Sequence, residues 1–393
     1  MRPTTATAGE TTENKTNGSR IMPASRQRSL AGRYSIVTQA LALAAFGWAF
    51  FGWVNESYLY WFENPIWLNR YTEYAMILAF GVWRISAEEN PYTKKRLATL
   101  VAIVTVLWWL IPWLIPFYEP YAGHMISQPV FPSLHTPGTL TFFLTLGLVF
   151  LFGRRVICGW GCPCVGIRES VGFPFRSRTI TGPTAWKWRH VKWIFFALYV
   201  AAAYAIFRWA PNSWTSTFLG LFTLLVVIPY FATFFLSPIT GNRFYCRYLC
   251  PYGATFGLLN KVGFFRIDFN KETCTDCDLC EKVCDMGIPV VTIGKAEGRV
   301  DTTECMGCGR CVTECPSRSL AFHDIRNMAF PALRQDGRML KESSGLASPL
   351  FLRHAAIFAF MMLTVGLMAG WFFTSVGSPA ELSNNLVGLV CGH

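Results

Sequence analysis

Long stretches without a charged residue constrain the fold of this chain more than any other feature. They cover 34–55, 97–118, 209–242 and 355–380, with shorter ones at 138–153 and 193–207. A helix crosses the hydrocarbon core of a membrane with about 20 apolar residues, and most of these stretches reach or approach that length. A soluble core could hardly hide a chain that is 52% hydrophobic and 16% aromatic. We therefore expect a polytopic α-helical membrane protein.

The apolar stretches predict about seven spans, at 34–55, 66–85, 97–118, 138–153, 190–209, 217–237 and 354–376. Span 66–85 is the weakest of these, because Arg70 and Glu73 lie in its first turns, where we expect them to pair at i,i+3 near the outer interface. If this segment lies flat, six spans remain and the N-terminal tail changes sides. That alternative moves an Arg-rich tail to the external face, so seven spans are favoured.

The placement of Lys and Arg explains the formal charge of +12. With the N-terminus in the cytoplasm, all 35 of these residues except Arg70 and Arg208 fall in the N-terminal tail, in 84–96, in 154–192 or in 243–353. Positive residues collect on the cytoplasmic side of membrane proteins. The pattern therefore predicts a bacterial-type cytoplasmic (inner) membrane protein, and the charge requires no nucleic-acid partner.

Two runs of four cysteines repeat the spacing C-x2-C-x2-C-x3-C. The first run is Cys274, Cys277, Cys280 and Cys284, and the second is Cys305, Cys308, Cys311 and Cys315, followed by Pro316. This spacing is typical of bacterial two-cluster ferredoxins, in which the fourth cysteine of each run binds the other cluster. Two [4Fe–4S] clusters are therefore predicted, one on Cys274, Cys277, Cys280 and Cys315, the other on Cys305, Cys308, Cys311 and Cys284.

Zinc and disulfides are the alternatives for these eight cysteines. Tetrahedral zinc sites also use paired C-x2-C motifs, but they do not require three cysteines at that spacing followed by x3, twice. A disulfide framework does not suit a segment that faces a reducing cytoplasm.

Between the runs, 290–293 and 298–300 predict a short hairpin, and 320–325 predict a closing strand. Asp285 stands where proline often follows the fourth cysteine, and we expect it to alter the local loop and the potential of the second cluster.

The segments 155–163 (RVICGWGCP) and 243–251 (RFYCRYLCP) share Arg, two Cys and Pro at an offset of 88 residues. Each follows a pair of apolar stretches and precedes Val-Gly-Phe, so the chain contains a duplicated helical hairpin. Both motifs should emerge on the cytoplasmic face, and parallel repeats commonly place a site between the copies. The prolines suit the first position of a following short helix.

The cysteines of these two C-x3-C-P motifs are Cys158, Cys162, Cys246 and Cys250. On a helix, residues four apart point the same way, and neighbouring arginines shift a thiol towards thiolate. The two pairs could therefore meet and hold a further iron–sulfur centre, or act as redox-active thiols. The simpler alternative is that they only fill space in interfacial turns, which the duplicated spacing disfavours. Cys164 lies outside the repeat, and we expect it only to pack.

These features divide the chain into six parts. They are a disordered cytoplasmic tail (1–33), N-terminal membrane spans (34–137), the duplicated hairpin region (138–264), an inserted α+β two-cluster bacterial ferredoxin-like domain (265–330), a linker (331–353), and a C-terminal span with a short external tail (354–393). The sequence has no C-x-x-C-H haem motif, dinucleotide fingerprint or P-loop.

The combination of CGWGCP, CRYLCP, CTDCDLCEKVCDMGIPV and CMGCGRCVTECP resembles the NapH/NosR/CcoG group of membrane-bound 4Fe–4S ferredoxin-type proteins, over about 140–325. The resemblance implies transfer of electrons between the quinone/quinol pool and a redox partner, which could be a reductase, a cytochrome or a ferredoxin in a larger complex. The chain would then be the electron-transfer subunit of a quinol dehydrogenase-like oxidoreductase. The rival hypotheses are an assembly factor that reduces a metal ion or a thiol for a respiratory enzyme, and a redox sensor.

Overall fold

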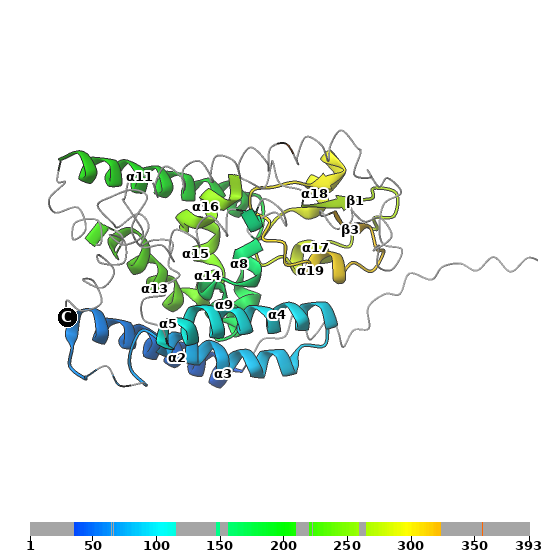
Figure 1. The fold of residues 1–393 in the computed structure, drawn as a ribbon. Coiled ribbons are helices and arrows are strands. Elements are labelled where there is room, and N and C mark those ends of the chain that lie inside the picture. Colours follow the sequence, from blue (N-terminus) through cyan, green and yellow to red (C-terminus); the bar gives the residue numbers. More distant parts are fainter. Residues whose placement is uncertain are drawn as a thin grey trace, which may run out of the picture.

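The computed structural model describes residues 35–63, 65, 67–114, 147–149, 156–209, 220–221, 223–258, 265–323 and 356. The expected tail 1–33, the linker 331–353, nearly all of the C-terminal part 354–393 and most of the span 138–153 lie outside these residues. In Figure 1 the described residues form a long helical part, with a small domain of strands and short helices at one end.

Three helices near the N-terminus pack side by side. They are α2 (Ile36–Val54), α3 (Thr72–Ala87) and α4 (Pro91–Ile103), which continues through η2 (Val104–Leu110) into α5 (Ile111–Leu114). A short π-helix, η1 (Asn55–Leu59), extends α2, and α3 contacts both α2 and α4. Side-chain caps fix where α2 and α4 begin, because Ser35 accepts a hydrogen bond from Thr38 N and Asn90 accepts from Tyr92 N and Thr93 N.

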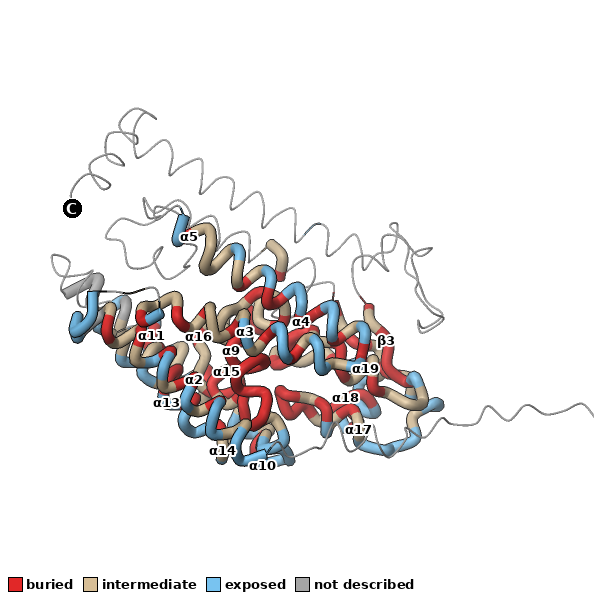
Figure 2. The backbone as a smooth tube through the Cα atoms, turned by 90° about the horizontal axis from the view of Figure 1, so that it is seen from below, coloured by how far each residue is buried: buried red, intermediate tan, exposed pale blue. Residues whose placement is uncertain are grey.

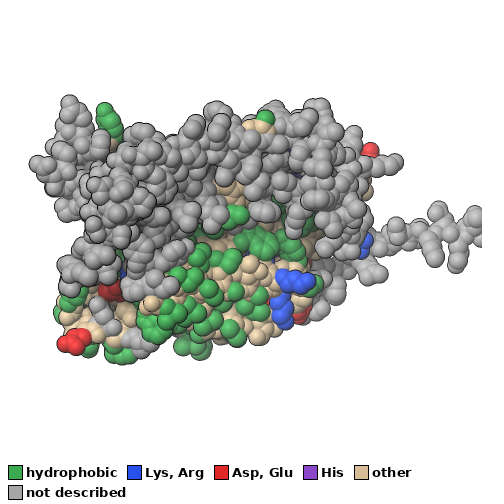
Figure 3. Space-filling view, in the orientation of Figure 1, with side chains coloured by type: hydrophobic (Ala, Val, Ile, Leu, Met, Phe, Trp, Pro, Cys, Tyr) green, Lys and Arg blue, Asp and Glu red, His purple; other side chains and the backbone are tan. Residues whose placement is uncertain are grey.

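Two of the described helices, Ile36–Val54 and Pro91–Leu114, are long and apolar enough to cross a membrane. Their outward side chains are large and hydrophobic, among them Ile36, Leu41, Trp113 and Leu114. Figure 3 shows hydrophobic side chains covering this face, with Lys and Arg gathered at the end nearest the small domain. A contiguous apolar surface of this kind is rare on soluble monomers.

The other expected spans that the structure describes are helical as well. The segment 190–209 forms α11 (Val191–Trp209), and 217–237 contains η6 (Thr223–Val227) and α13 (Ile228–Phe235). The number of seven spans stays a prediction. The expected pair of Arg70 and Glu73 is wrong: Arg70 Nε lies 3.4 Å from Glu56 Oε1, while Glu73 accepts a hydrogen bond from Tyr230 Oη at 2.5 Å. Glu73 thus faces the core and not the outer interface.

Each C-x3-C-P motif forms two short helices. The first motif gives α8 (Val156–Trp160) and α9 (Pro163–Glu169), and the second gives α15 (Phe244–Tyr248) and α16 (Pro251–Leu258). The prediction that Pro163 and Pro251 open short helices is confirmed. Between the two motifs lie four further short helices, η3 (Phe173–Arg178), α10 (Pro183–Lys187), η4 (Trp188–His190) and α14 (Ser237–Thr240).

The small domain is built on a three-stranded antiparallel sheet. The strand β1 (Arg266–Phe269) lies between β2 (Arg299–Val300) and β3 (Leu320–His323), with Ile267 opposite both Val300 and Phe322. Three helices complete the domain, α17 (Leu279–Lys282), α18 (Val290–Glu297) and α19 (Arg310–Thr313). The strand expected at 320–325 is confirmed as far as the structure describes it.

The hairpin expected between the cysteine runs is wrong in its first half, because 290–297 form the helix α18, whereas the second half contains the strand β2, which pairs with β1. Pro289 occupies the N-cap position, and Gly298 at φ +68° ends the helix in a left-handed conformation. Because this helix has defined residues at both ends, 290–297 do not need to pair with a β-strand. The β-branched residues that suggested a strand, Val290 and Val291, are instead buried in the domain core.

Two hydrophobic cores hold the molecule together, one among the helices and one in the small domain. Cys158 of the first C-x3-C-P motif packs against both. Figure 2 shows buried backbone running through α9 and α15 and on into α18, so burial is continuous between the two parts. The small domain is therefore docked on the C-x3-C-P helices.

Replacing Gly159 by Ala should loosen this docking. A Cβ atom at this position would lie 2.6 Å from the backbone oxygen of Met306, which is closer than real Cβ contacts. We expect a loss of about 1–3 kcal/mol, the usual range for overpacking, and faster hydrogen exchange of 305–311. The matched control is Gly47→Ala, because a Cβ there meets nothing within 4 Å. Equal exchange in the two variants would contradict the predicted contact.

Candidate iron–sulfur site

Four of the eight predicted ligands line one pocket of the small domain, and we call them the outer cysteine set: Cys274, Cys277, Cys280 and Cys315. Cys277 is exposed and Cys280 is buried, while the other two are partly buried. Burial, followed by the charge of Glu281 and of the other three thiols, raises the pKa of Cys280. The two-cluster arrangement expected from the sequence would assign these four residues to one cluster.

The remaining four form the inner cysteine set: Cys284, Cys305, Cys308 and Cys311. Cys305 is buried and the others are partly buried. Burial raises the pKa of Cys284 to about 12, and the nearby Cys308 and Cys305 contribute to this shift. Burial and the same neighbours raise the pKa of Cys311. Thiols that raise one another's pKa in this way lie close together, and a bound cation would reverse the effect by stabilising their thiolates.

The two cysteine runs adopt the same backbone shape with different residues. In the second run, Gly307 and Gly309 have φ values of +66° and +74°, and the corresponding positions of the first run are Asp276 and Asp278 at +53° and +54°. Asp tolerates this left-handed region better than most residues. A Cβ at Gly309 would lie 2.5 Å from Phe322 and 2.7 Å from Tyr92, so the inner loop has room only for glycine.

The type and placement of the donor atoms decide whether these residues suit iron–sulfur clusters. The outer cysteine set lines one pocket, and thiolate is the ligand that such clusters use. No three Cys, His, Asp or Glu side chains of the described residues are arranged to hold a single metal ion, and a four-iron cluster instead binds one thiolate on each iron. The donor set therefore fits the clusters.

The two cysteines of each C-x3-C pair do not lie on one continuous helix. Cys158 lies in α8, but the helix ends at Trp160 and Cys162 is extended, with φ −84° and ψ 126°, as the N-cap of α9. Cys246 lies in α15, which ends at Tyr248, before Cys250. The following proline forces this break, because the residue before proline avoids the helical conformation.

Cys162, Cys164 and Cys250 gather beside the helical core. A hydrogen bond with Cys164 lowers the pKa of Cys162, with further help from the Val165 and Cys164 backbone and from Arg243. The same bond with Cys162, together with burial, raises the pKa of Cys164, and Cys250 adds to this. The structure therefore brings cysteines of the two repeats together. Sequence reasoning missed Cys164 because nothing in the second repeat matches it.

Both C-x3-C-P turns contact the loops that carry the inner cysteine set. From the first turn, Gly159 touches Met306, and Trp160 Nε1 donates to the carbonyl of Gly307 at 3.4 Å. From the second turn, the guanidinium of Arg247 lies against Gly287, three residues after Cys284. The inner set consequently faces the helical part of the molecule, and the outer set lies beyond it.

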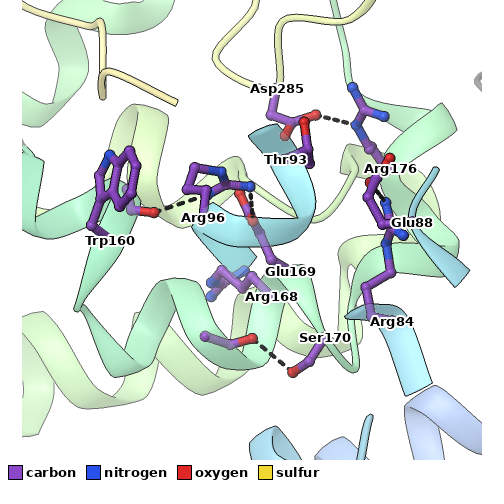
Figure 4. A network of polar contacts seen from close by, with 12 residues as sticks. Arg84, Glu88, Thr93, Arg96, Trp160, Arg168, Glu169, Ser170, Arg176 and Asp285 are labelled. Carbon is purple, nitrogen blue, oxygen red and sulfur yellow. Dashed lines mark hydrogen bonds and ion pairs between the residues drawn. The ribbon is translucent and has the colours of Figure 1, made fainter. Parts of the chain in front are cut away.

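A buried carboxylate connects the segments beneath this contact. Glu169, which is 1% exposed, forms ion pairs through its two oxygens with Arg96 of α4 and with Arg243, the N-cap of α15. Arg96 also donates to the carbonyl of Gly159 at 2.8 Å. Figure 4 shows the Arg96 guanidinium reaching both the carbonyl beside Trp160 and the carboxylate of Glu169. Burial alone would raise the pKa of Glu169, but Arg96, Arg243 and Arg310 lower it to about 2.

Other polar contacts fasten the small domain to the helical part. Asp285 pairs with Arg176 (Figure 4). Nη2 of Arg176 also donates to the carbonyl of Val283 at 2.7 Å. Lys192 at the start of α11 pairs with Glu304. In addition, Asn90 Nδ2 donates to Glu314 Oε1 at 2.8 Å. Sequence reasoning singled out Asp285 only for its position after Cys284 and found none of these contacts, because the sequence around an Arg or Lys does not show which carboxylate it will meet.

Comparison with known proteins agrees with this arrangement. Residues 266–316 match the family model of a 4Fe–4S dicluster domain, and 134–180 and 218–272 match the model of a 4Fe–4S binding domain, once around each C-x3-C-P motif. No solved structure matches the chain.

Several curated relatives are similar over the same region. The ferredoxin-type protein NapH of Haemophilus influenzae is 22% identical over 70% of this chain and 91% of its own length. The regulatory protein NosR of Stutzerimonas stutzeri is 21% identical over 66% of this chain and 37% of its own length. YccM of Escherichia coli is 29% identical over 50% of this chain, which spans 58% of that relative.

The cysteine runs, their pocket and the matched models define a ferredoxin-type iron–sulfur protein. Within this class, the relatives named NapH and NosR and the two matched models support a NapH/NosR-like family.

Replacing Glu169 by Gln should destabilise the protein by about 3–5 kcal/mol, because it leaves two buried guanidinium groups without their carboxylate. The pKa of Glu169 in the folded protein, about 2, lies below its ordinary value of 4.5. Its contribution to stability is therefore present above pH 4.5 and is lost as the pH falls towards 2.

Thermal unfolding in detergent, followed between pH 6 and pH 3, tests this sign. The wild type should lose more stability on acidification than Glu169→Gln, although Asp285, whose pKa is also lowered by its arginines after the opposing effect of burial, keeps part of the dependence in both proteins. The matched control is Glu272→Gln, an exposed carboxylate of the small domain. Parallel pH profiles for the wild type and Glu169→Gln would refute the proposed ionisation.

Proposed function

We propose that the chain is a membrane-bound electron-transfer protein that relays electrons between the quinone/quinol pool and a redox partner protein, such as a periplasmic reductase system. The observation that carries the proposal is the placement of the two cysteine sets. The inner set lies against both C-x3-C-P turns, and the outer set has an exposed ligand, Cys277. Such a placement gives electrons a route between the membrane part and a partner in solution.

The proposal uses two [4Fe–4S] clusters. The outer cysteine set would hold one and the inner cysteine set the other, so that the fourth cysteine of each run completes the opposite site. When bound, such clusters accept and release single electrons. The chain supplies the thiolates, the hydrophobic surroundings of Cys280 and Cys305, and the exposed edge at Cys277.

Membrane attachment is supported by the two long apolar helices and by the exposed hydrophobic face that they carry. The arrangement proposed is a multi-pass protein of a bacterial-type inner membrane, with the small domain in the cytoplasm, because Lys and Arg collect at that end. Quinol is soluble in the membrane, so its electrons would enter through the helical part. Within the described molecule, the C-x3-C-P turns lie next to both the helical core and the inner cysteine set.

The C-x3-C-P cysteines are proposed to form a further redox site between the two repeats. The hydrogen bond between Cys162 and Cys164 and the nearby Cys250 support this role, and so does the match of each repeat to a 4Fe–4S binding model. The site would be either a further iron–sulfur centre or a group of redox-active thiols. The same cluster of thiols favours, as a second candidate function, reduction of a metal ion during assembly of a respiratory enzyme.

The first test is the metal content and reduction of the protein purified without oxygen. Two clusters require about eight iron and eight sulfide per chain, and a clear excess would indicate a further centre. A quinol analogue should bleach the visible absorbance and produce an electron paramagnetic resonance signal. If quinol does not reduce the clusters and the reduced protein does not reduce a quinone, the relay is wrong.

Two matched variants test the order of the sites. Cys277→Ser should impair only the outer cluster and leave reduction by quinol intact, whereas Cys305→Ser should abolish reduction of the outer cluster as well, because the inner site lies between it and the membrane part. Equal effects of the two substitutions would contradict this order. Reduction of copper(II) that is lost in Cys162→Ser but kept in Cys277→Ser would favour the assembly function.

A further inference from the structure

The charged groups beside the inner cysteine set are unusual in number and in burial. Four arginines, Arg96, Arg176, Arg243 and Arg310, surround two carboxylates, Glu169 and Asp285, and all but Arg176 are almost completely buried. Taken as a group, these residues carry an excess of positive charge. Other buried charges nearby form the pairs Lys192–Glu304 and Arg84–Glu88, and Glu314 bonds to Asn90. Two further buried arginines donate to backbone carbonyls, Arg247 to Ile180 and Arg168 to Tyr230, and so add to the positive charge.

This excess of positive charge lies close to the inner ligands. Arg310 is in the second cysteine run itself, between Cys308 and Cys311. Its Nε and Nη2 are buried and have no hydrogen-bond partner among the described residues, so its charge is only partly neutralised. Arg96 enters from α4 and is fixed by Glu169 and the Gly159 carbonyl. Burial raises the pKa of Cys308, whereas Arg96 and Arg310 oppose this and Asp285 reinforces it.

A cluster held by four thiolates carries net negative charge, and reduction adds one more electron. Inside a protein, where the dielectric is low and water is excluded, nearby charges act strongly on such a change. The reduction potential of these clusters depends on surrounding charge, hydrogen bonds and solvent exposure. Burial of the inner site alone would disfavour the reduced state, and fixed positive charge opposes that effect.

The outer cysteine set has a different environment. Two of its charged neighbours, Asp276 and Lys295, form an exposed pair with a 2.6 Å contact. Asp278 is exposed as well, and Glu281 is partly buried and accepts a hydrogen bond from Val291 N. Exposed charges are screened by water and salt, so this pair has little influence. Fixed charges can therefore tune the reduction potential of the inner site, whereas they have little influence on that of the outer site.

We propose that Arg96 and Arg310 raise the reduction potential of the inner cluster and that Asp285 lowers it, so that residues of a membrane helix and of the docking surface set how readily electrons enter the small domain. This inference rests on the proposed function, because it requires clusters at both cysteine sets. It makes Arg96 a positioning residue that acts through its charge, contributed by the helix Pro91–Leu114, which is long enough to cross the membrane.

The test is a redox titration of the purified full-length protein, followed by electron paramagnetic resonance. The signal of the inner cluster is identified as the one that remains in Cys277→Ser. Arg96→Gln should lower the midpoint potential of the inner cluster by about 59 mV, a tenfold change for a one-electron couple. Asp285→Asn, which preserves the shape of the side chain, should raise that potential, and Arg96→Lys should restore most of the loss.

A purely structural role for these residues would not give shifts of opposite sign. The control Lys295→Gln removes an exposed positive charge and should leave the inner potential unchanged. If Arg96→Gln does not fold, Arg310→Gln replaces it and should shift the potential in the same direction. Inner potentials that stay constant, or that move the same way in the Arg and Asp variants, overturn the inference. Absence of two clusters in the wild type would instead overturn the proposed function.

Discussion

The ion pairs of Glu169 are the interaction on which the arrangement of this molecule depends. One carboxylate at the end of α9 joins Arg96 from the N-terminal helices and Arg243 from the second repeat. Removing a carboxylate from water costs several kcal/mol, which only close and well-directed partners can offset. The three groups must therefore be brought together accurately, and their meeting fixes the relative position of three segments that are far apart in the sequence.

The docking of the small domain follows from this arrangement. Because Arg96 also holds the Gly159 carbonyl, it fixes the turn on which Met306 and Gly307 rest. The pair Arg176–Asp285 then holds the loop of the first cysteine run, and the pair Lys192–Glu304 holds the loop of the second. A hydrophobic contact alone would allow the domain to slide, whereas directed ion pairs specify one orientation. The proposed electron route needs that precision, since it depends on which cysteine set faces the helical part.

The sequence was informative wherever the chemistry is local. The spacing of the eight cysteines predicted a 4Fe–4S domain, which the matched family model supports, and the role of each cysteine stays a prediction. The closing strand and the helices after Pro163 and Pro251 were found from short patterns. Prediction failed at 290–297, where β-branched residues suggested a strand but helix-ending residues decided the outcome. The buried network could not be predicted, because Arg96 has the same pattern as any arginine that marks the cytoplasmic end of a span. Glu73 misled for a related reason: its partner, Tyr230, is distant in sequence.

The unequal exposure of the two cysteine sets also bears on how the protein is made. Cys277 is open to solvent, whereas Cys305 is buried, and the two residues after it, Met306 and Gly307, lie against Gly159 and Trp160. If the two sets hold the proposed clusters, iron and sulfide should enter the inner site before docking, and the outer site can be filled or repaired afterwards. Apo-protein that has already docked should take up iron at the outer site alone. Under the proposed function, synthesis of this chain would then follow an order in which cofactor insertion precedes the final folding step.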